Sequence, residues 1–274
     1  MQKKYELTGE TKLLFGRTLY RIRALISFNN IEVGDLGGWI ESEKNLDQSD
    51  NAWVYDNAWV YGDAEVYGNA EVYGNARVYG NARVSGNAWV YGNARVYGNA
   101  RVYGNAEVSG DAEVSGDAWV YGDAEVYGNA RVYGNARVYG NAEVSGDAEV
   151  SGDAEVYGNA RVYGNARVSG NAEVSSNAEV SGNAEVSGDA WVYKSEHILV
   201  IGPMGSRCAY TTFAYSKDKC IKVRCGCFFG TIDEFLDKVK ETHGDSKHAM
   251  VYRAAIEVAK AQIEITDDGE QEEK

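Results

Sequence analysis

Residues 51–194 repeat one six-residue pattern of apolar and polar positions twenty-four times, almost without error: Asn/Asp, Ala, a variable residue, Val, Tyr/Ser, Gly. Ala and Val stand two apart, so both point to one face of an extended segment, while the variable residue points to the other. The Gly and the following Asn or Asp tolerate positive φ and supply a corner. The pattern therefore predicts short strands joined by tight turns, stacked so that neighbouring repeats bury each other's Ala and Val.

The repeat also places an aliphatic residue four positions before a small one, as Val96 stands before Ala100. This spacing resembles the hexapeptide repeat of left-handed parallel β-helix proteins, which build each triangular coil from three hexads. The resemblance implies an all-β solenoid, a left-handed parallel β-helix of about eight 18-residue coils. When every third hexad is stacked, neighbouring residues at the variable position have opposite charges slightly more often than like charges. Stacking every second hexad gives an equally favourable set of charge pairs. The coil size and the left hand therefore rest on the resemblance.

Residues 1–50 depart from the repeat and predict a cap for the open end of the first coil. Two extended runs within residues 12–26 flank a turn at Gly16 and indicate a β-hairpin. The spacing of six between Val33 and Trp39 indicates a degenerate first coil. Gly37-Gly38-Trp39-Ile40 ahead of the hexads resembles the lead-in of bacterial poly-hexapeptide proteins, some of which are assigned as acyltransferases.

Residues 195–265 predict a small α+β domain, followed by an acidic disordered tail over 266–274. A strand at 197–201 precedes a hairpin of 208–215 and 220–227, with Lys217-Asp218 as its two-residue turn. That register would place Cys208 opposite Cys227. Thr231 and Glu234 form a capping box at the start of a helix, and a second helix follows. The domain resembles one found in phage-borne and mobile-element genes, often behind hexapeptide repeats, and the resemblance implies no activity.

The charge and the hydropathy of the chain exclude several classes of partner. The net charge is −14, and the repeats carry most of it. An acidic surface repels phosphate backbones, so we expect no nucleic-acid binding along the solenoid. We expect no membrane span, because no run of about 18 apolar residues occurs. The N-terminal lysines precede no apolar segment typical of a signal peptide, so a cytoplasmic location is predicted.

Exposed aromatic residues concentrate at the N-terminal end of the repeats. The fifth position is Tyr in the first five hexads and Ser throughout residues 165–188. One interpretation is ring-on-ring packing between coils. The other is a binding face for a protein or glycan partner. The residues that would form this face are Trp53, Tyr55, Trp59, Tyr61, Tyr67 and Tyr73.

Acyl transfer is the enzymatic activity that the resemblance brings into consideration. Acyltransferases of this fold have a catalytic histidine on or near a coil and loops that interrupt the hexads. The hexads here contain no histidine and no insertion, since His197, His243 and His248 all follow the repeats. A general base must come within hydrogen-bond reach of its substrate. The sequence thus predicts at most a degenerate acyltransferase, and we expect no enzyme and no cofactor.

The C-terminal domain carries two further sets of candidate ligand-binding residues. Cys225, Cys227, His243 and His248 are zinc-ligand types, although Cys-x-Cys is tighter than the usual spacing. The alternative is that the cysteines are buried thiols, because free cysteine commonly packs as a small hydrophobe. Gly205, Ser206 and Arg207 follow a strand and could hold an anion such as a nucleotide phosphate, or form an ordinary turn.

Three hypotheses about function result. The favoured one is a non-enzymatic scaffold in which an acidic solenoid is a rigid spacer, with recognition at the C-terminal domain or at the Tyr/Trp-rich end. The alternatives are a protein that sequesters an anion or nucleotide and a degenerate hexapeptide acyltransferase. The sequence leaves the partner and any homo-oligomer open.

Overall fold

A computed structural model of the chain describes residues 2–265 and divides it into two compact units, residues 1–147 and 148–274. The boundary between the units falls inside the hexapeptide repeats. The predicted acidic tail, residues 266–274, lies outside the described residues. Each unit contains stacked coils of parallel β-structure and one end segment with antiparallel strands.

In the first unit every full coil contributes one short strand to each of three parallel sheets. One sheet holds β3 (Leu36–Ile40), β5 (Trp59–Gly62), β8 (Arg77–Gly80), β11 (Arg95–Val96), β14 (Glu113–Val114) and β17 (Arg131–Val132). The next holds β6 (Glu65–Val66), β9 (Arg83–Val84), β12 (Arg101–Val102), β15 (Trp119–Val120) and β18 (Arg137–Val138). The third holds β4 (Trp53–Val54), β7 (Glu71–Val72), β10 (Trp89–Val90), β13 (Glu107–Val108), β16 (Glu125–Val126) and β19 (Glu143–Val144).

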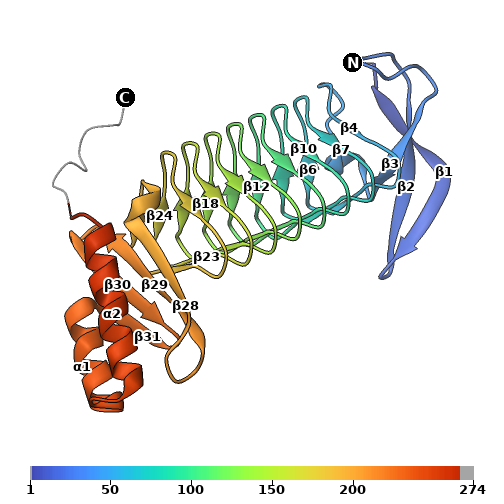
Figure 1. Cartoon of the computed structure of the whole chain (residues 1–274). Helices are drawn as coiled ribbons and strands as arrows, with labels where there is room; N and C mark the ends of the chain where they lie inside the picture. The colour runs from blue at the N-terminus through green and yellow to red at the C-terminus, as the bar shows by residue number, and fades with distance from the viewer. Residues whose placement is uncertain (1, 266–274) are drawn as a thin grey trace. The chain divides into compact units, whose positions relative to one another are not determined.

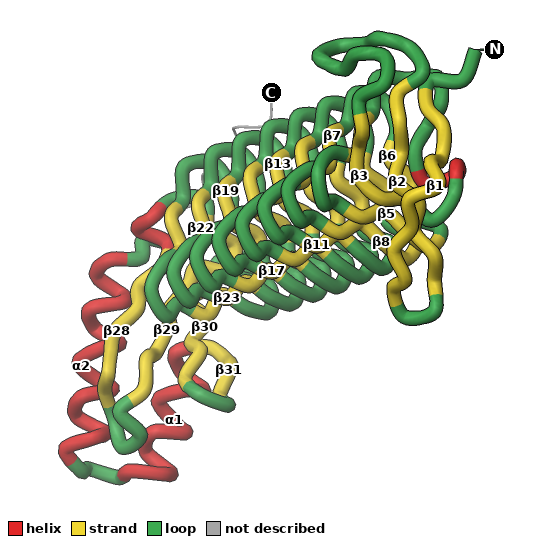
Figure 2. The backbone as a smooth tube through the Cα atoms, turned by 90° about the vertical axis from the view of Figure 1, so that its right-hand side faces the viewer, coloured by secondary structure: helices red, strands yellow, loops and turns green. Residues whose placement is uncertain are grey.

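The coils of the second unit follow the same plan. Their three sets of strands are β20 (Glu149–Val150), β23 (Arg167–Val168) and β26 (Glu185–Val186); β21 (Glu155–Val156), β24 (Glu173–Val174) and β27 (Trp191–Val192); and β22 (Arg161–Val162) and β25 (Glu179–Val180). In Figure 2 the short strands stand in rows, separated by loops at the corners of the coils.

The register confirms the 18-residue coil, because each strand pairs with the strand three hexads further on, as Val96 pairs with Val114. All the Ala and Val residues of the repeat are buried, which confirms the predicted core. The corner glycines have positive φ and lie so close that a Cβ on Gly86 would be 2.8 Å from the nitrogen of Gly104. The solenoid has about nine turns, one more than the hexads alone provide. The left hand stays a prediction.

The additional turn is the predicted degenerate coil, which begins at β3 rather than at Val33. Trp39 pairs in parallel with Trp59, and Leu46 forms a bridge with Val66, so this coil has 20 residues instead of 18. The short helix η1 (Glu43–Asn45) occupies one of its corners. Val33 itself is exposed and takes no part in the core.

The predicted N-terminal hairpin is present and consists of β1 (Tyr5–Leu14) and β2 (Arg17–Ala24) (Figure 1). β2 pairs antiparallel with β3, so the hairpin extends one sheet of the coils beyond the repeat. The buried Nζ of Lys4 donates hydrogen bonds to the carbonyl oxygens of Asp50 and Ala52 at 2.6 and 2.9 Å. These bonds satisfy backbone groups of the first coil, as a cap must.

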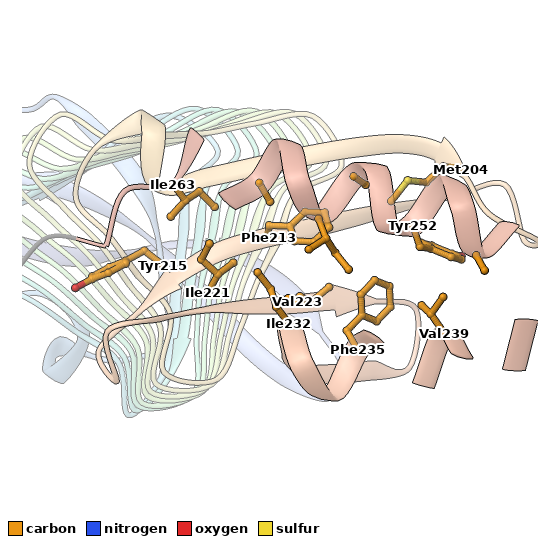
Figure 3. Close-up of a cluster of buried hydrophobic side chains, with 14 residues drawn as sticks. Met204, Phe213, Tyr215, Ile221, Val223, Ile232, Phe235, Val239, Tyr252 and Ile263 are labelled. Atoms are coloured by element: carbon orange, nitrogen blue, oxygen red, sulfur yellow. The ribbon is translucent and has the colours of Figure 1, made fainter. Parts of the chain in front are cut away.

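The C-terminal domain is an antiparallel sheet covered on one face by two helices (Figures 1 and 3). After the short helix η2 (Ser195–His197) come β28 (Ile198–Met204), β29 (Ala209–Ser216), β30 (Cys220–Cys225), β31 (Phe228–Thr231), α1 (Ile232–His243) and α2 (Lys247–Gln262). Phe213, Val223, Phe235 and Ile256 are among the side chains buried between sheet and helices. The capping box is confirmed, since Thr231 and Glu234 exchange side-chain to backbone hydrogen bonds.

The predicted hairpin register was wrong by one residue. Ser216 pairs with Cys220, and the turn has three residues, of which Lys219 has a φ of 54°. A left-handed third residue is typical of three-residue hairpin turns. Cys208 therefore does not lie opposite Cys227. The strand β31 was not predicted.

No helix among residues 2–265 is both long and apolar enough to cross a membrane.

Candidate functional site

The outward side chains of the coils are largely bound to their own counterparts in the next coil. Asparagines at the first hexad position donate from Nδ2 to the Oδ1 atom 18 residues further on, at 3.0 Å from Asn51 to Asn69 and 2.8 Å from Asn105 to Asp123. An ionised Asp can only accept, so each such ladder ends where Asp replaces Asn. The ladders connect coils to each other and leave little of this face for a ligand.

The outward tyrosines follow a rule set by the residue in the next coil. Where that residue is Tyr, the rings contact each other: Tyr73 and Tyr91 stack with centroids 4.9 Å apart, whereas Tyr55 meets Tyr73 edge-on at 6.2 Å. Where it is Ser and the neighbouring variable residue is Glu, the hydroxyl donates to the carboxylate, at 3.0 Å from Tyr91 to Glu107. This arrangement supports the ring-packing interpretation for most of the tyrosines along the coils.

The predicted aromatic face divides into buried and exposed parts. Trp53 was expected on the surface, but it is buried, because Tyr5 and Phe28 of the N-terminal cap pack edge-on against its ring. Trp59 is partly covered by Arg77, whose guanidinium lies 4.7 Å from the ring centroid. The remaining predicted residues, Tyr55, Tyr61, Tyr67 and Tyr73, are partly or fully exposed.

Tyr67 differs from the other three tyrosines in its surroundings. In the next coil its column continues with Ser85, and the variable residue there is Arg83, because Val66 pairs with Val84. Neither a ring nor a carboxylate therefore stands in the positions that receive Tyr73 or Tyr91. The side chain of Tyr67 is 36% exposed and lines a groove at the N-terminal end of the coils.

The groove has a volume of about 970 Å³ and lies between the first coils and the segment that caps them. Its apolar lining residues are Ile26, Leu46, Val66 and Tyr67. Leu46 and Val66 are buried in the core, so Ile26 and Tyr67 provide the accessible apolar surface. Its polar lining residues are Gln2, Lys3, Glu43, Lys44, Asp47, Gln48, Ser49 and Glu65. An apolar floor with an aromatic ring and polar groups around it is typical of ligand sites.

The rim of the groove carries both signs of charge. Lys3 pairs with Glu43 at 2.6 Å, and Glu65 pairs with Arg83 at 3.3 Å. The pKa of Asp47 is lowered, chiefly by hydrogen bonds from the side chain and backbone of Ser49, so this carboxylate is ionised at neutral pH. The groove thus offers one ring face together with paired charges and hydrogen-bonding groups, which suits a sugar or a polar peptide segment.

Sequence reasoning identified Tyr67 but missed the groove and its polar lining. Most of that lining, Glu43 to Ser49, lies in the degenerate coil, where the hexad pattern gives no guidance, and Gln2 and Lys3 come from the N-terminal segment. The signal in the sequence was the spacing of 20 between Trp39 and Trp59. The two additional residues lie between Leu46, which bridges to Val66, and Trp53, which pairs with Glu71. This segment supplies Asp47, Gln48 and Ser49 to the groove.

The predicted anion site, Gly205-Ser206-Arg207, lies in the loop between β28 and β29. The amide of Cys208 donates to the carbonyl of Gly205 at 3.4 Å, which closes a tight turn. The hydroxyl of Tyr252 abuts Gly205, and there is no room for a side chain at that position. Arg207 lies near Gly226 in the neighbouring turn. An anion bound at Arg207 stays a prediction.

The structure places all four cysteines at least partly at the surface. Cys208 and Cys227 are exposed, and Cys220 and Cys225 are partly exposed, so the expectation of buried thiols was wrong. The cause is that β30 ends at Cys225 and the following turn carries Cys227 to the surface. Cys225 contacts Thr211 and Tyr252, with Sγ 3.3 Å from the Thr211 hydroxyl.

The other two candidate zinc ligands face one another on the helices. The rings of His243 and His248 are 5.9 Å apart between centroids, and His243 also stacks on Tyr252. Within residues 2–265, no three His, Cys, Asp or Glu side chains are grouped so that they could hold a metal ion.

The third histidine, His197, lies at the junction between the last coil and the C-terminal domain. It is buried, and its ring contacts Tyr193 and Tyr215. Burial, with a smaller effect of Lys194, lowers the pKa of His197, so the ring is neutral at neutral pH. An enclosed neutral imidazole between aromatic rings is placed to pack rather than to exchange protons with a substrate.

These features define a repeat β-solenoid protein with capped ends. The family model of the YdcK beta solenoid repeat matches residues 76–92, 88–104, 94–110, 124–140, 130–146, 154–170 and 160–176. The matches lie within the coils and cover less than half of the chain, so the similarity concerns the solenoid and names no activity. No curated protein matches the chain.

Proposed function

We propose that this protein is a non-enzymatic scaffold, in which the acidic solenoid is a rigid spacer and the groove beside Tyr67 is the site of recognition. The main observation behind the proposal is that the outward side chains of the coils bind to the neighbouring coil. Asn, Tyr, Glu and Arg along the coils bind the next coil in register, as Arg95 pairs with Glu113 at 2.9 Å. A surface that is occupied in this way stiffens the solenoid and provides few groups for chemistry.

The caps at both ends support a scaffold of fixed length. At the C-terminal end the amide of Glu179 donates to the hydroxyl of Ser195, and that of Glu185 donates to the hydroxyl of Thr212. These amides belong to the last coil, where no further strand follows. Because side chains of the domain satisfy them, these two amides are not free to pair with the strand of another molecule.

The placement of the histidines supports a non-enzymatic function. The hexads contain no histidine, and His197 is enclosed by tyrosines at the end of the solenoid. The four free cysteines fit the reducing cytoplasm, which we propose as the location. The resemblance of the C-terminal domain to domains of phage-borne genes suggests a phage or mobile element as the source of the coding sequence.

The partner that we propose for the groove is a glycan or a segment of protein. Tyrosine is favoured at binding surfaces because it provides a rigid apolar ring and a hydroxyl that hydrogen-bonds. A glycan array and a peptide array, probed with the tagged chain, test both classes. Tyr67→Ser is expected to abolish the binding that the wild-type chain shows.

Tyr127→Ser is the matched control, because Tyr127 has the same exposed fraction of 36% but lies outside the groove. The control is expected to bind like the wild type. If the wild-type chain binds neither array, or if both variants bind equally, recognition at this groove is wrong.

Deletion of a whole coil tests the spacer. Removal of residues 105–122 joins Gly104 to Asp123 and preserves the phase of the hexads. We expect this variant to unfold cooperatively and to bind the same ligand as the wild type, because the groove is untouched. Removal of residues 105–121 shifts Ala and Val out of phase and should prevent folding. If the in-phase deletion folds but loses binding, the ligand site lies between coils and the spacer hypothesis fails.

A further inference from the structure

The outer face of α2 is apolar, although it is exposed. The inner face of the helix packs on the sheet through Tyr252, Ile256 and Ala259. On the opposite side Met250 is 62% exposed and Val258 is 50% exposed. The outer apolar residues, hereafter the α2 stripe, are Met250, Ala254, Val258 and Ala261.

The α2 stripe is continuous along the helix. Its spacings of four, four and three residues follow the helical repeat, so the four side chains fall within about 80° of the helix circumference. The neighbouring helix α1 provides a comparison, because its exposed side chains are Asp233, Glu234, Asp237, Lys238, Lys240, Glu241 and Thr242, all polar. The outer side of α1 is therefore entirely polar, whereas the outer side of α2 carries this apolar stripe beside polar residues such as Lys247, Glu257 and Lys260.

We propose that the α2 stripe binds the α2 stripe of a second copy of this chain, with the two helices antiparallel. A twofold axis near Val258 brings Val258 opposite Val258 of the second copy. Ala254 then faces Ala261 of the second copy, and Ala261 faces Ala254. The small alanine side chains allow the two helix backbones to approach closely on either side of the central valines.

The charges beside the α2 stripe select this partner and this direction. Glu257 and Lys260 lie on the same flank of the stripe, 3.4 Å apart within the helix, and their side chains are 73% and 48% exposed. In the antiparallel pair Glu257 faces Lys260 of the second copy, and Lys260 faces Glu257. In a parallel pair about a twofold axis each flank faces the opposite flank of the other helix, where Val251 and Gln262 carry no charge. Glu257 and Lys260 would therefore lose these partners. The surface is thus complementary to itself in one orientation only.

Ile265 is the one exposed apolar residue among residues 263–265, which follow the helix. Residues 266–274 contain no apolar side chain. A pair of single helices buries less than the roughly 1,200–2,000 Å² of a standard interface. The dimer is therefore concentration-dependent. Two copies joined in this way would present two grooves at once, a consequence that rests on the proposed function, whereas the dimer itself does not.

Sedimentation velocity of the full chain over a wide range of concentration tests the dimer. We expect the wild type to pass from monomer to dimer as its concentration rises. Val258→Glu places two carboxylates on the twofold axis and should keep the chain monomeric throughout. Thr242→Glu adds the same charge to the exposed side of α1 and should dimerise like the wild type. A wild type that stays monomeric, or a Val258→Glu variant that still dimerises, overturns the proposal.

Charge exchange on the flank tests the geometry without touching the apolar residues. Glu257→Lys alone and Lys260→Glu alone each create two like-charged contacts across the axis, and dimerisation should weaken about tenfold. The double variant Glu257→Lys/Lys260→Glu restores both pairs and should dimerise within about threefold of the wild type. If the double variant is as weak as the single ones, the antiparallel register is wrong. Circular dichroism of each variant confirms that α2 is intact.

Discussion

The ring of Phe229 lies directly against Gly188, in the last coil of the solenoid. A Cβ atom at Gly188 would overlap the ring, whereas a Cβ at Gly182, one hexad earlier, would have no atom within 4 Å. The two glycines have nearly the same backbone, with φ of 65° and 66°. They differ in what covers them, because β31 carries Phe229 over one corner of the coil and leaves the other open.

The difference between Gly182 and Gly188 predicts how the C-terminal domain is held on the last coil. Gly182→Ala should cost about 1–2 kcal/mol through backbone strain alone. Gly188→Ala should cost about 1–3 kcal/mol more, because the methyl group displaces the ring. Chemical denaturation measures both values. Phe229→Ala in the Gly188→Ala background should remove the difference, and an equal effect of the two alanines would contradict the packing described.

Adjacent lysines at the N-terminus are expected to differ in their contributions to stability. Lys4 is buried, and burial lowers its pKa to about 8, yet its ammonium group donates to two carbonyls of the first coil. Lys4→Met leaves those carbonyls without a donor and should destabilise the chain by about 1–3 kcal/mol. Lys3 forms an exposed pair with Glu43, so Lys3→Met should change the free energy of unfolding by less than about 1 kcal/mol. Similar losses from both variants would show that Lys4 is not a structural cap.

Like charges stack at several places on the coils. Glu125 lies between two other Glu residues, so replacing Glu by Arg should have opposite effects at Glu125 and at Glu113. Glu125 pairs with Glu107 on one side and Glu143 on the other, and burial followed by these two charges raises its pKa. Glu125→Arg should therefore stabilise the chain by about 0.5 kcal/mol. Glu113 lies between Arg95 and Arg131, so Glu113→Arg should destabilise it by about 0.5–1 kcal/mol.

Thermal unfolding at low and high salt provides the check on this charge effect. Both changes should shrink in high salt, because screening weakens interactions between exposed charges. Shifts of the melting temperature with the same sign for the two variants would mean that the strand propensity of Arg, rather than the charge of the neighbouring coils, decides the stability.

The coils could be predicted from the sequence because each hexad repeats the same pattern of Ala, Val and Gly. Ala and Val two apart fix the inner face, and the corner requires a glycine because a Cβ there would come within about 3 Å of the next coil's backbone. The exception in the repeat follows the same logic. Ser176 stands at a glycine position with a φ of 55°, and the residue 18 positions further on is Lys194, so no glycine corner stacks on it.

The candidate site could be predicted only in part, because it depends on contacts between segments that the repeat does not specify. Tyr67 belongs to the hexads and was identified, but its exposure results from Arg83 and Ser85 in the next coil. Trp53 has the same position in its hexad as other outward residues, yet the cap buries it. The displacement of Cys208 from Cys227 came from a single additional turn residue, Lys219.

Alkaline pH should unfold the solenoid through its tyrosines. Burial, as the main cause, raises the pKa of Tyr55, Tyr73 and Tyr79 from 10.0 to about 12. The folded pKa is above the unfolded one, so their stabilisation is complete below pH 10 and is lost as pH rises through about 12. Denaturation at rising pH, with tyrosinate absorbance as the second signal, measures this. Tyr79→Phe should make the loss less steep, and an unchanged slope would contradict the burial of its hydroxyl.

Acidic pH should destabilise the junction between the last coil and the C-terminal domain through protonation of His197. Its pKa is lowered mainly by burial, with a further effect of Lys194, while Glu196 opposes the shift. The buried Nδ1 has no hydrogen-bond partner among the described residues. Because the folded pKa lies below the unfolded value of about 6.5, the contribution to stability is complete above that pH and is lost as the pH falls.

The variant His197→Phe keeps an aromatic ring between Tyr193 and Tyr215 but removes the titrating group. We expect its melting temperature to fall less than that of the wild type between neutral pH and about pH 5, where carboxylates still contribute equally to both. His248 is exposed on α2, so His248→Phe should follow the wild-type profile. If His197→Phe and the wild type lose stability in parallel, the junction between the last coil and the C-terminal domain does not exclude the charged imidazole.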